Sequence, residues 1–350
     1  MHRFTPLLIA ALAVAASAWS EPTVLPGKPP HHTADGFRNR YPHPEKGGFW
    51  DWKLEQWKLG LPHKPADGYR FETARPDERR LHENRRDATV TWIGHATLLV
   101  QMGGLNILTD PQFSERASPV AFAGPKRVVP PVPALDRLPH IDAVVISHDH
   151  YDHLDRDSVV ALANQPGGPP RFFAGLGMKE WFADAGIDNV EEMDWWQDAD
   201  LGGVRFTFVP VQHWSKRSLW DANRRLWGGW VLRHPSFSFF FAGDTGYSKD
   251  FADIGARFGG FDLAAIPVGA YAPRWFMSIM HVDPGEAVRI HRDVGARQSV
   301  GIHWGTFDDL TDESLYEPPQ VLAREREKAG LEADDFFLMK HGETRVLRRL

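Results

Sequence analysis

The stretch SHDHYDHLD occupies residues 147–155 and directly follows an apolar run that predicts a short buried strand at 143–147. It places three histidines and an aspartate within six residues: His148, His150, Asp152 and His153. Alternate side chains of an extended chain point the same way, so the first two histidines can bind one ion, and a turn after them brings the next pair to a second ion. Imidazole nitrogens and carboxylate oxygens are suitable zinc ligands. A chance cluster of solvated histidines explains this pattern poorly, because the cluster ends an apolar strand.

Single polar residues end three later apolar stretches in the same way. These are His213, Asp244 and His303, at the ends of strands predicted at 204–210, 237–242 and 299–303. A lone histidine after a strand is more often structural than functional, so each residue is weak evidence by itself. Together with the dense cluster, however, they make four strand-end sites in one chain. This pattern indicates a metal centre built from histidines and aspartates.

Short strands and helices follow one another from residue 88 onward. Strands are predicted in two groups, at 88–93, 97–101, 105–108 and 143–147, and then at 204–210, 229–233, 237–242, 262–268, 299–303, 336–340 and 344–347. Helices are predicted at 157–164, at 318–329 and after the N-cap Asp283, where Pro284 and Glu286 complete a helix-start pattern. Because helices follow the strands of each half, the predicted fold is α/β, a four-layer αββα sandwich.

The composition is that of a globular protein, with 42% apolar and 25% charged residues. The formal net charge of −6 argues against a nucleic-acid partner. The chain contains no cysteine, so after export it would be stabilised by core burial and bound metal rather than by disulfides. The sequence leaves the oligomeric state open, and an oligomer is compatible with it.

Residues 1–18 have the pattern of a secretory signal peptide. A basic start precedes the apolar run 4–16, and small residues end the segment at Ala18. The run is shorter than the roughly 20 residues that span a bilayer, which favours a cleaved signal over an anchor. The predicted organisation is a signal peptide at 1–18, an N-terminal arm at 19–87 and a main domain at 88–350, in a periplasmic or secreted protein. N-terminal sequencing of the mature protein checks the cleavage.

The arm is rich in proline and aromatic residues and contains one predicted helix, at 49–59. Trp50, Leu54, Trp57 and Leu61 fall at helical spacing on one face. Packing of this face against the main domain is the favoured interpretation. The alternative is an interfacial helix with membrane contact, because tryptophan beside lysine suits the headgroup layer.

The HxHxDH cluster, followed in order by a histidine, an aspartate and a histidine, resembles the metallo-β-lactamase superfamily. The resemblance implies the αββα fold of that superfamily and a centre of two metal ions, zinc first. The implied ligands are His148, His150 and His213 for one ion, Asp152, His153 and His303 for the other, and Asp244 as the bridge between them. Iron and manganese also suit ligands of these types.

Further motifs resemble one family within that superfamily, the N-acylphosphatidylethanolamine-hydrolysing phospholipases D. They lie between residues 88 and 345 and include WIGHAT at 92–97, GPKR at 124–127, DWW at 194–196, FAGDTGY at 241–247, GAYAPRWFM at 269–277 and HWGTF at 303–307. The resemblance implies a phospholipid substrate, cleaved to N-acylethanolamine and phosphatidate. Residues 1–87 depart from the family pattern, so the membrane contacts of the family are not carried over to them.

The implied mechanism follows from the metals. Two metal ions that share one oxygen make hydroxide available at neutral pH and stabilise charge on a phosphoryl group. The resemblance therefore implies attack by a metal-bound hydroxide, with Asp152 and His281 as the catalytic residues. Lactone opening would use the same centre, so a lactonase or another phosphodiesterase of this fold is the alternative function. A metal-dependent binding protein is a third hypothesis, which the complete ligand set argues against.

Other residues have both a functional and a structural interpretation. His281 resembles a family residue near the substrate phosphate, although it also stands at the start of a predicted helix. His95 is expected to be structural or to support a ligand, and Asp110 either orients a metal-bound histidine or forms an Asp-Pro turn. Two interpretations, an acyl-chain entrance and an aromatic core, remain for Tyr271, Arg274, Trp275, Phe276 and Met277.

Overall fold

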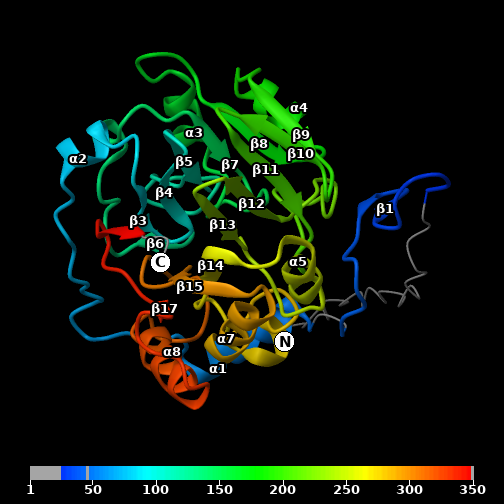
Figure 1. The fold of residues 1–350 in the computed structure, drawn as a ribbon. Helices are drawn as coiled ribbons and strands as arrows, with labels where there is room; N and C mark the ends of the chain where they lie inside the picture. Colours follow the sequence, from blue (N-terminus) through cyan, green and yellow to red (C-terminus); the bar gives the residue numbers. More distant parts are fainter. Residues whose placement is uncertain (1–24, 45–46, 348–350) are drawn as a thin grey trace, which may run out of the picture.

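The computed structural model describes residues 25–44 and 47–347 of the chain. The predicted signal peptide, residues 1–18, lies outside this range. The described strands form two mixed seven-stranded sheets that pack face to face, with helices on the outer faces (Figure 1). The predicted αββα sandwich is therefore confirmed.

The first sheet has the strand order β18-β3-β4-β5-β7-β8-β9. Its strands are β3 (Ala88–Gly94), β4 (Thr97–Met102), β5 (Leu105–Thr109), β7 (Ala143–Val145), β8 (Arg171–Gly175), β9 (Val190–Met193) and β18 (Thr344–Leu347). Strand pairing is antiparallel from β18 to β5 and parallel from β5 to β9. Gly103 and Gly104 form the tight turn between β4 and β5, with φ values of 58° and 82° that glycine adopts without strain.

The second sheet has the order β10-β11-β12-β13-β14-β15-β17. Its strands are β10 (Asp198–Leu201), β11 (Val204–Val209), β12 (Gly229–His234), β13 (Phe237–Phe241), β14 (Phe261–Pro267), β15 (Ala296–Ile302) and β17 (Phe336–Phe337). Pairing is antiparallel from β10 to β13 and parallel from β13 to β17. Two short pairs lie outside the sheets, β1 (His32–Thr33) with β2 (Gly36–Phe37) and β6 (Lys126–Arg127) with β16 (Phe307–Asp308).

Helices cover the outer face of each sheet (Figure 1). Apolar side chains of α2 (Glu78–Glu83), α3 (Arg156–Ala163) and α4 (Lys179–Asp184) pack on the first sheet, and those of α5 (Asp250–Phe258), α7 (Pro284–Asp293) and α8 (Glu317–Lys328) pack on the second. The predicted start of α7 is confirmed, because the Asp283 side chain accepts a hydrogen bond from the Glu286 backbone N–H and a full capping box forms. None of the described helices combines the length and the apolar character that crossing a bilayer requires.

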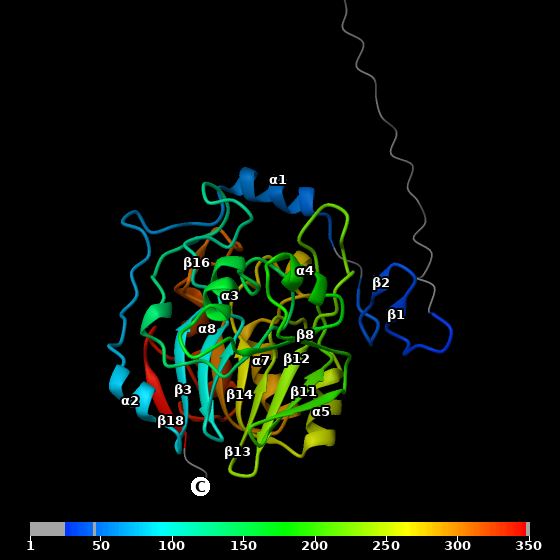
Figure 2. The ribbon, with the colours of Figure 1, turned by 90° about the horizontal axis from the view of Figure 1, so that it is seen from above.

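The N-terminal arm lies against the sandwich and carries α1 (Phe49–Leu59) across one end of it (Figure 2). Trp52 is 5% exposed, stacks on Phe276 and donates from its indole nitrogen to Asp312 over 2.9 Å. Trp50 and Trp57, by contrast, are each 80% exposed. The helix thus packs on the main domain as expected. It does so with the face that carries Trp52, however, and the prediction that the apolar stripe with Trp50 and Trp57 would be buried was wrong.

Candidate metal centre

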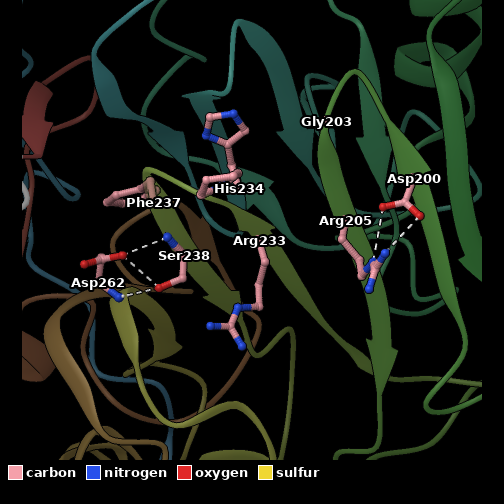
Figure 3. A pocket seen from close by; sticks show the side chains of 9 residues that line it. Asp200, Gly203, Arg205, Arg233, His234, Phe237, Ser238 and Asp262 are labelled. Carbon is pink, nitrogen blue, oxygen red and sulfur yellow. Dashed lines mark hydrogen bonds and ion pairs between the residues drawn. The ribbon is translucent and has the colours of Figure 1, made fainter.

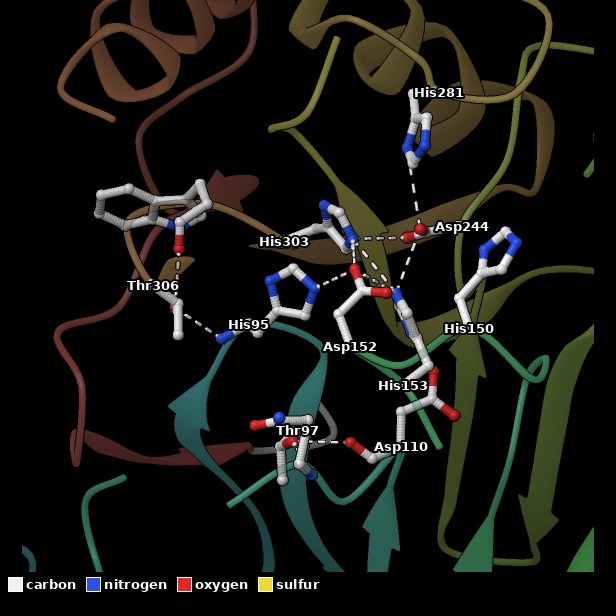
Figure 4. A network of polar contacts seen from close by, with 12 residues as sticks. His95, Thr97, Asp110, His150, Asp152, His153, Asp244, His281, His303 and Thr306 are labelled. Atoms are coloured by element: carbon white, nitrogen blue, oxygen red, sulfur yellow. Dashed lines mark hydrogen bonds and ion pairs between the residues drawn. The ribbon is translucent and has the colours of Figure 1, made fainter. Parts of the chain in front are cut away.

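The sequence-predicted site residues converge where the strands of both sheets end. His148 and His150 follow β7, and Asp152 and His153 lie in the turn after them; His213 follows β11, Asp244 follows β13 and His303 follows β15. Parallel strands of neighbouring β-α units have their carboxyl ends at one edge, which is where α/β proteins place their sites. Residues separated by up to 155 positions therefore come together in one cluster (Figure 4).

Three histidines form the first group of the cluster. The Nε2 of His148 lies 2.9 Å from the Nδ1 of His150, and the Nε2 of His213 lies 3.3 Å from the same atom. The Nδ1–H of His213 donates to the carbonyl oxygen of Met280 over 2.9 Å. That bond fixes the tautomer and leaves Nε2 of this ring as the free lone pair that faces the other two histidines.

His153, His303 and Asp152 form the second group. The Nε2 atoms of the two histidines lie 3.2 Å apart, and each is 3.4 Å from Oδ2 of Asp152. Asp244 stands between the groups, with Oδ2 3.1 Å from His153 Nε2 and 3.9 Å from His148 Nε2, and with Oδ1 3.1 Å from His303 Nε2. Asp244 thus reaches histidines of both groups, as a bridging carboxylate must.

Asp110 supports histidines of both groups from below. Its Oδ2 accepts a hydrogen bond from His153 Nδ1 over 2.7 Å and from the Ser147 hydroxyl over 2.5 Å. Ser147 Oγ in turn lies 2.9 Å from His148 Nδ1. A carboxylate that holds the far nitrogen of a histidine fixes the ring orientation and raises its strength as a metal ligand. The structure therefore places Asp110 in the orienting position rather than in a mere turn.

His95 lies beside the second group and contacts the predicted ligand Asp152. Its Nε2 lies 2.9 Å from Oδ2 of Asp152, and its carbonyl accepts from the backbone N–H of His303 over 3.0 Å. Both His95 and His303 have positive φ, 55° and 64°, which is uncommon for residues with a Cβ atom. The backbone N–H of His95 donates to Thr306 Oγ1 over 2.8 Å, one of the contacts that hold this conformation.

The charges in the cluster favour a cation between the two groups. Burial lowers the pKa of His148 well below its ordinary value and lowers the pKa of His150 and His213 to about 3. These imidazoles are neutral at pH 7, which is the form that binds a metal. Burial also acts to lower the pKa of His153, but the carboxylates of Asp244, Asp152 and Asp110 together outweigh it and hold this pKa well above the usual range. These buried carboxylates thus attract positive charge at the centre of the cluster.

The donor set fits metal ions. Imidazole nitrogens face each other at 2.9 Å and 3.2 Å in the two groups, and a cation between such lone pairs is more favourable than their bare contact. Among the described residues, the buried Nδ1 of His281 has no hydrogen-bond partner, and it lies 3.8 Å from Asp244 Oδ2. Nitrogen and carboxylate donors of this kind suit zinc, iron and manganese.

A pocket of about 310 Å³ opens above the cluster. Its polar lining includes His150, Asp152, Asp244 and His281, together with Lys216 and Thr311. Its apolar part includes Phe49 and Trp52 of α1. It also includes Phe276 and Met277 of α6 (Arg274–Met277) and Met280, which follows that helix. The arm therefore provides one wall of the pocket directly above the predicted ligands.

Of the residues 271–277, which had two interpretations, only Phe276 and Met277 line this pocket. The Tyr271 hydroxyl donates to Glu317, and Arg274 pairs with Glu286 over 2.7 Å, so both have structural contacts. Sequence reasoning missed Trp52 as a pocket residue. Its position between the exposed Trp50 and the partly buried Lys53 gave no periodic pattern that pointed to the site.

A larger hollow, about 470 Å³, lies at the opposite ends of the strands of the second sheet (Figure 3). Both of its carboxylates are paired, Asp200 with Arg205 over 3.2 Å and Asp262 with Ser238 over 2.8 Å. The residues that line the hollow therefore offer no cluster of convergent ligands comparable to the metal centre.

Comparison with known proteins agrees with this geometry. The family model of the beta-lactamase superfamily domain matches residues 105–304. A Caenorhabditis elegans protein named N-acyl-phosphatidylethanolamine-hydrolyzing phospholipase D 1 is 46% identical over 242 residues, which are 66% of this chain and 68% of that protein. A mitochondrial Saccharomyces cerevisiae protein named N-acyl-phosphatidylethanolamine-hydrolyzing phospholipase D is 38% identical over 239 residues, which are 66% of this chain and 50% of that protein. The chain thus spans between half and about two-thirds of the length of these relatives.

Two solved structures have the same architecture. A possible metal-dependent hydrolase from Veillonella parvula aligns with a TM-score of 0.60 at 19% identity, over 75% of this chain and 100% of that one. An isothiocyanate hydrolase from Delia radicum gut bacteria aligns with a TM-score of 0.58 at 20% identity, over 74% of this chain and 99% of that one. At these identities the likeness shows a shared fold.

Proposed function

Because the chain belongs to the metallo-β-lactamase superfamily, and within it to the N-acylphosphatidylethanolamine-hydrolysing phospholipases D, we propose that it hydrolyses N-acylphosphatidylethanolamine to N-acylethanolamine and phosphatidate. The chain is a metal-dependent hydrolase. The observation that supports the finer proposal is the pocket, which has the histidine–aspartate cluster as its polar part and apolar side chains of α1 and α6 beside it. A substrate with a phosphodiester next to long acyl chains matches both parts. A lactonase or another phosphodiesterase of the same fold is the alternative.

We propose two zinc ions in the cluster, while iron or manganese would suit the same donors. The proposed ligands are His148, His150 and His213 for one ion, Asp152, His153 and His303 for the other, and Asp244 for both. Bound there, two divalent cations would lower the pKa of a water molecule and withdraw charge from the phosphoryl oxygens.

Side chains of the protein would orient the substrate over this centre. His281 lines the pocket and presents an unpartnered, buried Nδ1 beside Asp244, so it is placed to bind the phosphate or the leaving group. Asp152 also lines the pocket and would act both as a ligand and as a carboxylate that orients the attacking water. Hydrolysis would then form a bond between the water oxygen and phosphorus and break the bond between phosphorus and the ethanolamine oxygen, and one proton of the water would end on that leaving oxygen.

Mass spectrometry of the lipid products, with the purified and metal-loaded enzyme in oxygen-18 water, tests the proposed reaction. The label is expected in phosphatidate and not in N-acylethanolamine, because water attacks phosphorus. Added ethanol should give little phosphatidylethanol, because direct attack by water needs no covalent phosphatidyl-enzyme. Label in N-acylethanolamine would place the cleavage at carbon, and abundant phosphatidylethanol would show a covalent intermediate. Hydrolysis of lactones without lipid cleavage would favour the alternative function.

Contact with a phospholipid surface is part of the proposal, because the exposed apolar side chains gather round the pocket. Ten of the twelve large apolar residues that are exposed in the described chain lie in four segments: Phe49, Trp50, Leu54, Trp57 and Leu59 of α1, Val120 and Phe122, Leu219 and Trp220, and Trp275 of α6. The pocket is lined by α1 itself, by Ala117 and by Lys216. Ala117 lies three positions before Val120 in the chain, and Lys216 lies three positions before Leu219. Exposed tryptophans of this kind suit the interfacial layer of a bilayer. The protein would meet this surface in the periplasm or outside the cell, as the predicted signal peptide implies.

Replacing Trp50 and Trp57 together with alanine should weaken binding to phospholipid vesicles by about ten-fold or more, because the two indoles would leave the interface. Turnover of a short-chain soluble phosphodiester should stay close to that of the wild type. Vesicle co-sedimentation and a soluble-substrate assay measure the two effects. Val346→Ala is the matched control, since this exposed residue of β18 lies at the other end of the sandwich (Figure 2). Equal loss of vesicle binding, soluble turnover and thermal stability would instead mean that the two tryptophans pack as core.

A further inference from the structure

The N-terminal arm contacts the candidate metal centre at a second place besides the pocket wall. The side-chain oxygen of Asn39 accepts a hydrogen bond from the backbone N–H of His213 and another from the indole N–H of Trp227, each over 3.0 Å. His213 is 2% exposed, and Trp227 is 1% exposed. A buried backbone N–H needs a partner, and here the partner comes from a residue 174 positions earlier in the chain.

His213 is otherwise held from the opposite side. Its ring nitrogen Nδ1 donates to the Met280 carbonyl, and the neighbouring Gln212 accepts from the backbone N–H of Gly246 over 2.8 Å. The Gln212 carbonyl and the His213 N–H belong to one planar peptide group, so Gly246 holds this group at its oxygen. Asn39 holds the same group at its other end, by accepting from the N–H. Trp227 keeps a second acceptor, the Val211 carbonyl at 3.1 Å, so the His213 amide is the group that depends on Asn39.

Several contacts place the Asn39 side chain at this spot. The backbone N–H of Phe37 donates to the Asn223 carbonyl over 2.8 Å, within the loop that follows His213. Gly36 approaches the same carbonyl so closely that a Cβ atom would lie 2.1 Å from its oxygen. On the N-terminal side of Gly36, His31 and His32 both bind Asp194, over 2.6 Å and 2.7 Å.

Arg40 holds the following end of this segment by pairing with Asp253 over 2.7 Å. The segment 31–41 is thus held at its two ends and in its middle, and only Asn39 touches a predicted ligand. We infer that Asn39 is a positioning residue for the metal ligand His213, and that the arm is consequently an integral support of the metal centre. This holds whichever phosphodiester or lactone the enzyme cleaves.

The test is the affinity of the protein for Zn²⁺, measured without any substrate by competition with a chromophoric chelator. Asn39→Ala leaves the His213 amide without its acceptor, and the affinity of the site formed by His148, His150 and His213 should fall about ten-fold or more. Asn39→Asp keeps an acceptor of the same shape and should retain most of the affinity. Elemental analysis after dialysis against the chelator should find fewer zinc ions in the alanine variant than in the wild type.

Arg40→Ala is the matched control, because it frees the same segment at Asp253 without touching His213. It should lower the melting temperature of the metal-free protein but keep the zinc affinity. If Asn39→Ala does not fold, Asn39→Leu, which keeps the size of the side chain but offers no acceptor, should produce the same loss of zinc. Wild-type zinc affinity in the folded Asn39→Ala protein would overturn the inference. An equal loss of affinity in Arg40→Ala would also overturn it, by showing that general loosening of the arm is the cause.

Discussion

Asp244→Ala is expected to reduce hydrolysis by about 10³-fold or more and to leave fewer than two metal ions per chain. Oδ1 of Asp244 lies 3.1 Å from Nε2 of His303, and Oδ2 lies 3.1 Å from Nε2 of His153. Oδ2 also lies 3.9 Å from Nε2 of His148 in the first group. Asp244 is 2% exposed, so no water replaces it easily. Without the proposed bridge no carboxylate would set the separation of the two proposed ions, and the histidines of the two groups would lose their shared counter-charge.

Elemental analysis and product assays measure this effect on the same preparation. Asp200→Asn is the matched control, because Asp200 pairs with Arg205 at an exposed position in the hollow of Figure 3. The control should keep both metals and full activity. A fully active Asp244→Ala enzyme, or a wild-type enzyme with a single metal, would contradict the two-metal proposal.

The sequence predicted much of the architecture because most strands of the sandwich are short, apolar and bounded by turn residues. The limits of β4, β12 and β18 agree with the predicted ranges to within one residue. Strands β8, β9 and β10 were missed, since β9 and β10 carry charged residues that break the apolar pattern. Strand β7 ends at Val145 and β17 at Phe337, earlier than predicted, because the chain turns away from the sheet beyond these residues.

The cluster itself could be predicted because its residues stand at strand ends, where spacing along the chain predicts proximity in the fold. His213, Asp244 and His303 were identified in this way, and the structure brings them to the histidine-rich turn. The arm could not be placed by the same reasoning. Asn39 and Trp52 reach the centre through contacts that span 174 and 260 positions, and no local pattern indicates such contacts.

The arm helix shows why periodicity alone misled. Helical spacing identified an apolar face formed by Trp50 and Trp57, and burial of such a face is the usual outcome. Here the buried face is instead a mixed one, in which Trp52 and Gln56 both hydrogen-bond to Asp312. Polar contacts position the helix, and its apolar side remains available for another surface.

His281 differs from the seven proposed ligands in its position. It follows α6 and precedes the capping residue of α7, and its carbonyl accepts from Arg274 over 2.7 Å. Its ring lies 5.4 Å from that of His213 and 5.6 Å from that of His303, measured between ring centroids. Burial lowers the pKa of His281 to about 3, so in the metal-free protein the ring is neutral and can donate or accept one hydrogen bond in the pocket.

His281→Ala should therefore keep both metal ions and lower the turnover number by about 10²-fold or more, which is the range for loss of one group that transfers a proton or binds the reacting phosphate. The effect should fall mainly on kcat, because the apolar wall of Trp52 and Phe276 that would bind the acyl chains is unchanged. Replacing the leaving ethanolamine with a better leaving group, such as a nitrophenol, should recover much of the lost rate if His281 protonates the leaving oxygen. Little recovery would instead indicate that His281 binds the phosphate. Loss of metal in His281→Ala would show that the residue belongs to the ligand set, and its catalytic assignment would then be wrong.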